Sequence, residues 1–193
     1  MKRILLAALL CTTAISQSMA TTIYFTENFN DLSAWTPKAG SYASVSGNVL
    51  SFSSGNSAGD IFTTASYTSG FINFDYLGAS PADGGGYVGV SSGFPNNHVW
   101  LAGSSTSFAT PTSLINDSTW HHYSVAFDAV AMGVGANGHI MLEQYANNTA
   151  GQGQFRNLSV SDVAIVAVPE PETYAMMLAG LGLLGVMIRR KAA

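Results

Sequence analysis

The chain has 193 residues, enough for one globular domain with targeting segments, and only 9% of them are charged. Between residues 21 and 168, two basic residues stand against nine acidic ones, a net charge of −7. A segment this acidic has no basic stripe for a phosphate backbone, so we expect no nucleic-acid partner.

The first twenty residues have the organisation of a secretory signal peptide. They comprise a positive n-region, "MKR", an apolar h-region, "ILLAALLCTTAI", and a small-x-small cleavage site, "SMA". This order predicts export through the Sec translocase and cleavage by signal peptidase between Ala20 and Thr21. Cys11 is the only cysteine and would leave with the signal, so we expect neither disulfides nor thiol chemistry in the mature protein.

Short β-type runs alternate with turn clusters from residue 21 to residue 167. In "GFINFDYLG", for example, Ile72, Phe74 and Tyr76 share one face, with Asn73 and Asp75 opposite. No run sustains a helical period. The other runs are "SVSGNVLSFS", "DIFTTASY", "GYVGVSS", "HVWLAGS", "WHHYSVAFDAV", "GHIMLEQYA" and "FRNLSVSDVAIV". About eight or nine strands with regular turns predict an all-β domain, an antiparallel β-sandwich of the jelly-roll type.

Four oxygen-bearing side chains near the two ends of this domain are candidate calcium ligands. Calcium takes six to eight oxygen ligands, and a jelly roll often gathers them from both ends of the chain. The alternative is that "FND", which contains Asn30 and Asp31, is an ordinary turn. The candidates for a structural Ca²⁺ site are Glu27, Asn30, Asp31 and Asp162.

The loop "GFPNNHVW" is the best candidate for a glycan-binding site. Aromatic faces stack on the C–H surfaces of sugars, and amide side chains hydrogen-bond to hydroxyls. The competing interpretation is that Trp35, Trp100 and Trp120 serve core or strand-edge packing. The candidate residues are Tyr87, Phe94, Asn96, Asn97, His98 and Trp100.

Metal-dependent and carboxylate-dependent catalysis have little support. His121 and His122 are adjacent on a strand and point to opposite faces, so they are poorly placed to share a metal. Glycan hydrolysis needs two facing carboxylates, whereas Glu143 stands alone on its strand and Asp75 and Asp128 lie among apolar neighbours. We therefore expect no enzyme, and a glycan hydrolase is the least favoured alternative.

The chain ends with a proline-rich segment, an apolar run and a basic cluster. Pro169 and Pro171 bias their predecessors toward extended geometry. Residues 174–188 carry no charge and would span about 23 Å as a helix, just short of the roughly 30 Å hydrocarbon core. The basic cluster of Arg189, Arg190 and Lys191 should remain cytoplasmic. A plain single-pass anchor would explain the apolar run but not the order of all three parts.

This order closely resembles the PEP-CTERM sorting signal of Gram-negative bacteria that make exopolysaccharide. The motif residues are Pro169, Glu170 and Pro171, and the signal covers 168–193. The resemblance implies a transient transmembrane helix at 174–188 and processing by a membrane-embedded exosortase. It also implies delivery to the cell surface or extracellular matrix.

The domain of residues 21–167 also resembles the concanavalin/laminin-G-like and carbohydrate-binding-module jelly rolls. The resemblance rests on "TENFNDLSAW", "WHHYSVAFD" and the closing "GQFRNLSVSDV". Such closing strands often have Asp just after the Phe, where this chain has Arg156. The predicted function is a structural or adhesive role in exopolysaccharide or biofilm. The alternatives are a carbohydrate-binding module and, less favoured, a glycan hydrolase.

Overall fold

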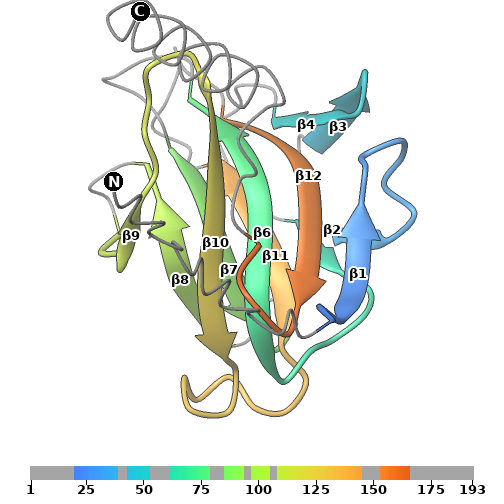
Figure 1. The fold of residues 1–193 in the computed structure, drawn as a ribbon, viewed down its shortest axis with the longest axis vertical. Helices are drawn as coiled ribbons and strands as arrows, with labels where there is room; N and C mark the ends of the chain where they lie inside the picture. Colours follow the sequence, from blue (N-terminus) through green and yellow to red (C-terminus); the bar gives the residue numbers. More distant parts are fainter. Residues whose placement is uncertain are drawn as a thin grey trace, which may run out of the picture.

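The structure is a computed structural model, and it describes residues 20–38, 43–52, 61–78, 85–93, 97–104, 108–144 and 153–165. These residues form twelve β-strands in two six-stranded sheets, and none of them is helical (Figure 1). No helix long and apolar enough to cross a membrane occurs in this part of the chain. The signal peptide and the predicted span at 174–188 lie outside the described residues.

Sheet A has the strand order β10-β6-β12-β4-β3, and β1 pairs with the C-terminal half of β12. Every pairing in this sheet is antiparallel. Its strands are β1 (Ile23–Glu27), β3 (Ala43–Ser46), β4 (Val49–Phe52), β6 (Ser69–Leu77), β10 (Trp120–Asp128) and β12 (Gln154–Ser161).

Sheet B has the strand order β2-β5-β11-β7-β8-β9, and only the short β8–β9 pairing is parallel. Its strands are β2 (Trp35–Pro37), β5 (Ile61–Thr63), β7 (Gly86–Ser91), β8 (His98–Gly103), β9 (Thr112–Ser113) and β11 (His139–Gln144). Consecutive strands repeatedly change sheet, as in a jelly-roll sandwich.

All eight strand runs predicted from the sequence contain strands, and "SVSGNVLSFS" forms two. These runs account for nine strands, and β1, β2 and β9 complete the twelve, so the sequence prediction of eight or nine strands was too low. The strands β2 and β9 have three and two residues and carry no readable alternation. In the hairpin between β3 and β4, Gly47 and Asn48 both have positive φ angles, of 57° and 64°. That turn geometry matches the twist of the flanking strands.

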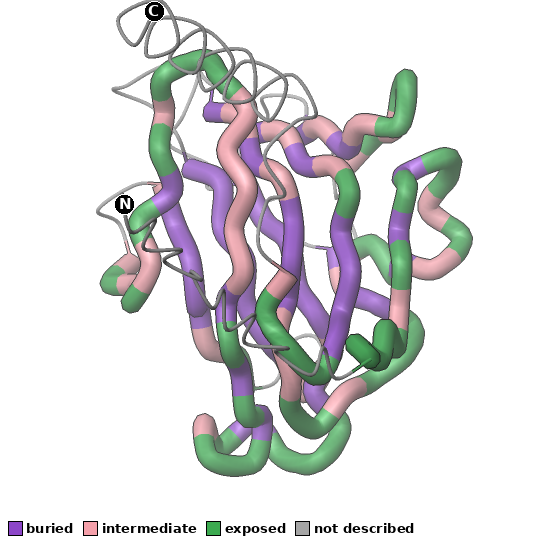
Figure 2. Tube along the Cα trace, in the orientation of Figure 1, coloured by how far each residue is buried: buried purple, intermediate pink, exposed green. Residues whose placement is uncertain are grey.

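The main core lies between the sheets and follows the period-two patterns of the sequence. Ile72, Phe74 and Tyr76 on β6 are fully buried and face the core, as predicted. Val88 and Val90 on β7 face them from sheet B. Figure 2 shows burial concentrated on the strands and exposure on the connecting segments.

Sheet B carries a second apolar cluster on its outer face. All six residues of β7 are buried, including Tyr87, whose side chain points away from the main core. Tyr87 forms a second cluster with Trp100 and Met141, and Phe62 and Phe108 pack against it. The described loops and strands therefore place a second apolar layer outside the sandwich.

Candidate functional site

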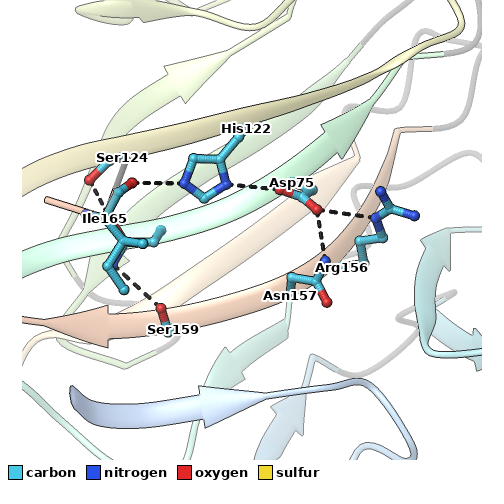
Figure 3. A network of polar contacts seen from close by, with 8 residues as sticks. Asp75, His122, Ser124, Arg156, Asn157, Ser159 and Ile165 are labelled. Carbon is cyan, nitrogen blue, oxygen red and sulfur yellow. Dashed lines mark hydrogen bonds and ion pairs between the residues drawn. The ribbon is translucent and has the colours of Figure 1, made fainter. Parts of the chain in front are cut away.

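The outer face of sheet A carries a hydrogen-bonded polar network centred on Asp75 (Figure 3). The Asp75 carboxylate lies 2.9 Å from His122 Nδ1 on β10. It also accepts hydrogen bonds from Arg156 Nε at 3.1 Å and Asn157 Nδ2 at 2.8 Å, both on β12. Three neighbouring strands thus supply one connected network.

A β-bulge in β12 brings two consecutive side chains to the same carboxylate. The register between β12 and β6 shifts between Arg156 and Ser159, and Asn157 has a φ of 51°. In a regular strand, neighbouring side chains would point to opposite faces. Because the bulge interrupts this alternation, Arg156 and Asn157 both reach Asp75 Oδ2, and Leu158 can still enter the core.

The surroundings of Asp75 favour its ionised form. Burial raises the pKa of this carboxyl, but the hydrogen bonds from His122, Asn157 and Arg156 together outweigh burial and hold it below its ordinary value. The Arg156 guanidinium carbon also lies 4.1 Å from the centre of the Trp120 ring. This cation–π contact ties β12 to β10.

The two adjacent histidines have separate partners, as their alternation predicted. His121 Nε2 lies 2.9 Å from both carboxylate oxygens of Asp117, while His122 faces Asp75 on the outer face. The sequence interpretation of Asp75 as isolated among apolar neighbours was wrong. Its partners lie 47 and 81 residues away in the chain and become neighbours only through strand pairing.

The outer face of sheet B carries two aromatic residues of the predicted glycan site, Tyr87 and Trp100. The Tyr87 and Trp100 ring centroids are 5.4 Å apart, and Phe108 lies 5.2 Å from Tyr87 and stacks on Trp100 at 6.1 Å. Tyr87 is fully buried and Trp100 is 9% exposed, so their rings form the inner part of the second apolar layer. Half-buried Phe62 and Phe108 form its accessible part.

Polar side chains border this aromatic layer. His98 and Asn97 are exposed at the start of β8, and the His98 ring lies 5.6 Å from Trp100. His139 on β11 packs against Phe62 at 5.7 Å and lies 2.6 Å, through Nδ1, from the Thr63 carbonyl oxygen. The predicted residues Phe94 and Asn96 lie outside the described part of the chain.

Trp100 also presents an unsatisfied donor. Its indole Nε1 is buried and has no hydrogen-bond partner among the described residues. Buried indole N–H groups usually find an acceptor, and a ligand hydroxyl or a water molecule would supply one.

The candidate calcium ligands are each engaged by protein donors. Asn30 Oδ1 accepts a hydrogen bond from Asn48, Asp31 from the Ser33 N–H, and Asp162 from the Thr22 N–H. Within the described ranges, no group of three or more His, Cys, Asp or Glu side chains could hold a metal ion. The calcium site stays a prediction.

Glu27, the remaining calcium candidate, ties down the turn that follows β1. Its carboxylate accepts hydrogen bonds from the Phe29 N–H at 2.5 Å and from Trp35 Nε1 at 2.8 Å. Phe29 and Trp35 stack with centroids 5.8 Å apart, and both are buried. The carboxylate therefore satisfies two donors that have no access to water.

We expect Glu27→Ala to destabilise the body, residues 21–167, by about 2 kcal/mol, because it leaves both donors buried without an acceptor. Thermal denaturation with calcium and with chelator measures the change and tests the metal prediction. A calcium-dependent rise in melting temperature that is lost in the variant would support a Glu27 ligand. Unchanged stability of the variant would contradict the structural role.

A shallow surface pocket of about 260 Å³ opens beside β1 and the start of β6. Tyr24, Tyr67, Thr68 and Ser69 line it, and Tyr24 is 53% exposed. This pocket offers two aromatic rings and four hydroxyl groups, which makes it a second place where a sugar ring could bind.

The sorting signal is found by comparison with known families. Residues 167–191 match the sequence model of the PEP-CTERM protein-sorting motif, one residue earlier than the predicted start. The motif marks an exported protein that is transiently anchored in the membrane and processed by an exosortase.

Known structures share the fold of the body. The chain is similar to a family 29 carbohydrate-binding module, with 13% identity, a TM-score of 0.51, and coverage of 74% of this chain and 88% of that one. A variant of the module CBM29-2 complexed with cellulohexaose shows 14% identity and a TM-score of 0.51, with 74% and 91% covered. No curated protein sequence matches the chain significantly.

These similarities confirm the predicted fold class. The body is a jelly-roll β-sandwich of the kind found in family 29 carbohydrate-binding modules, and a PEP-CTERM sorting motif follows it. At this level of identity, the likeness shows the fold alone.

Proposed function

We propose that the body is a non-catalytic module that binds polysaccharide through the outer face of sheet B. The observation that carries the proposal is the second apolar layer on that face, formed by Tyr87, Trp100 and Met141 with Phe62 and Phe108. The sandwich core is complete without it. Phe62 and Phe108 would contact sugar rings, and Tyr87 and Trp100 would support them from beneath.

The charge of the body favours an uncharged polysaccharide. Residues 21–168 carry a net charge of −7, which would repel an anionic polymer at low ionic strength. Arg156, one of the two basic residues in that range, is committed to Asp75 and Trp120 on the opposite sheet. Affinity would then come from stacking and from hydroxyl hydrogen bonds, and it would depend little on salt.

The sorting motif would deliver this module to the cell surface or the extracellular matrix. There it would contact the exopolysaccharide as an adhesive component, in line with the predicted role in biofilm. A purely structural matrix protein is the alternative. It would need the same sorting but no sugar contact, so a binding measurement separates the two.

We expect Phe62→Ala to reduce retention of the body by exopolysaccharide about tenfold, because loss of one stacking ring removes roughly 1–1.5 kcal/mol. Affinity electrophoresis in gels containing the host's exopolysaccharide measures retention, with cellulohexaose as a soluble competitor. Phe62 is half-buried, so the variant should stay folded. Tyr24→Ala, an aromatic deletion at the surface pocket of sheet A, is the matched control.

Each outcome assigns a different role. Loss in Phe62→Ala with full retention of Tyr24→Ala supports the sheet B face. Loss in Tyr24→Ala alone would move the site to the pocket beside β1. No retention of the wild-type body would contradict polysaccharide binding for that polymer and favour the structural role.

A further inference from the structure

The chain returns across sheet A after β12 and is held there at Ile165. Asn73 Oδ1 accepts a hydrogen bond from the Ile165 N–H at 2.9 Å, and His122 Nε2 lies 2.8 Å from the Ile165 carbonyl oxygen. Ser124 Oγ donates to the same Asn73 oxygen at 2.6 Å. The side chains of Asn73, Asp75 and His122 are called the stem clip below.

The stem clip holds both backbone polar groups of Ile165. In this part of the sandwich, the side chains of β6 and β10 therefore bind the returning chain as a neighbouring strand would (Figure 3). Asn73 is 1% exposed and also donates to Ser161 Oγ at 2.8 Å, which fixes the orientation of its carboxamide. The Asn73 side chain is thus already oriented to accept the hydrogen bond from the Ile165 N–H.

His122 can make both of its contacts only in the doubly protonated form. Its Nδ1 faces the Asp75 carboxylate and its Nε2 faces a carbonyl oxygen, and both of these are acceptors. A neutral imidazole has a single N–H. Asp75 already accepts hydrogen bonds from Arg156 and Asn157 and is a charged acceptor. A neutral His122 would therefore keep its hydrogen bond to the Asp75 carboxylate and lose the one to the Ile165 carbonyl oxygen.

Ile165, the residue that the stem clip holds, lies directly before the sorting motif in the chain. The match to that motif begins at residue 167, and three residues, 166–168, separate Ile165 from Pro169. This length of chain spans at most roughly 14 Å. Fixing Ile165 therefore fixes the region in which an exosortase can meet the motif.

We infer that Asn73, Asp75 and His122 are positioning residues for C-terminal processing, because they anchor the stem of the sorting signal at Ile165. The inference rests on the sorting role assigned to the motif. Ordering the stem in advance lowers the entropic cost of bringing the motif into the enzyme in one geometry. Opening the clip should therefore slow processing without abolishing it.

The test is a pulse-chase measurement of full-length protein in host cells that contain the exosortase. His122→Ala removes the contact to the Ile165 carbonyl, and Ile165→Pro removes the N–H that Asn73 accepts while leaving both sheets intact. His121→Ala and Ala164→Pro are matched controls, one residue away in each case. We expect both clip variants to convert several-fold more slowly than the wild type and both controls to match it.

Hydrogen exchange separates positioning from a general effect on the fold. In the detergent-solubilised full chain, the Ile165 N–H should be protected in the wild type and in His121→Ala, because Asn73 accepts its hydrogen bond. Protection at Ile165 should fall several-fold in His122→Ala, which loses the contact to the Ile165 carbonyl oxygen. Backbone amides of β6 and β10 should keep their protection in that variant.

The outcomes are distinct. Wild-type or faster conversion in both clip variants would overturn the positioning role and leave the sorting role intact. Wild-type protection of Ile165 in His122→Ala would overturn the role of His122. Failure of the wild-type chain to be converted would overturn the sorting role, and the inference with it.

Discussion

A chain in which Pro169 and Pro171 are both replaced by alanine should accumulate unprocessed in the inner membrane. The two prolines bias the preceding residues to extended geometry, the form in which a processing enzyme binds a peptide. Both lie within the matched sorting motif. Immunoblots of membrane and extracellular fractions should show near-complete loss of the released form, a larger effect than that of either clip variant.

The control for this experiment is Pro111→Ala, which changes a proline of the body and leaves the motif untouched. Its product should be released at the wild-type level. Normal release of the Pro169→Ala, Pro171→Ala chain would contradict exosortase recognition. The apolar run of residues 174–188 would then be read as a plain anchor.

The fold was predictable because its strands carry strong local patterns. Ile72, Phe74 and Tyr76 alternate with Asn73 and Asp75, and the structure places the first three in the core. The short strands β2 and β9 were not predictable, because three and two residues are too few to show an alternating pattern. Twelve strands therefore replace the predicted eight or nine.

The candidate sites were less predictable than the fold. Strand pairing, and the packing of other side chains over a site, determine which residues come together there. The sequence marks Arg156 only as a departure from the Asp that often follows the Phe of such closing strands, yet Arg156 binds Asp75 across 81 residues of sequence. No local signal marks the bulge at Asn157 that makes this contact possible. The sequence analysis places Tyr87 and Trp100 in one candidate glycan site, and their rings do lie 5.4 Å apart, but the sequence does not show that Phe108 packs on both.

The largest stability prediction concerns an aromatic residue of the main core. Phe155 on β12 is fully buried at the centre of the main core, with ring centroids 6.3 Å from Phe52, 6.1 Å from Phe74 and 5.3 Å from Tyr76. We expect Phe155→Ala to lower the free energy of unfolding by about 3–5 kcal/mol, through lost burial and the cavity left behind. That is a large share of the roughly 5–15 kcal/mol typical of a domain.

Urea denaturation of the body measures this change, and Phe62→Ala is the matched comparison. Phe62 lies on the outer face of sheet B and is only half-buried, so its loss should cost about 1 kcal/mol. Phe155→Ala should thus lose stability, while Phe62→Ala loses polysaccharide retention and stays folded. Equal destabilisation by the two variants would show that the outer layer is part of the core, which would remove the main support for a binding face.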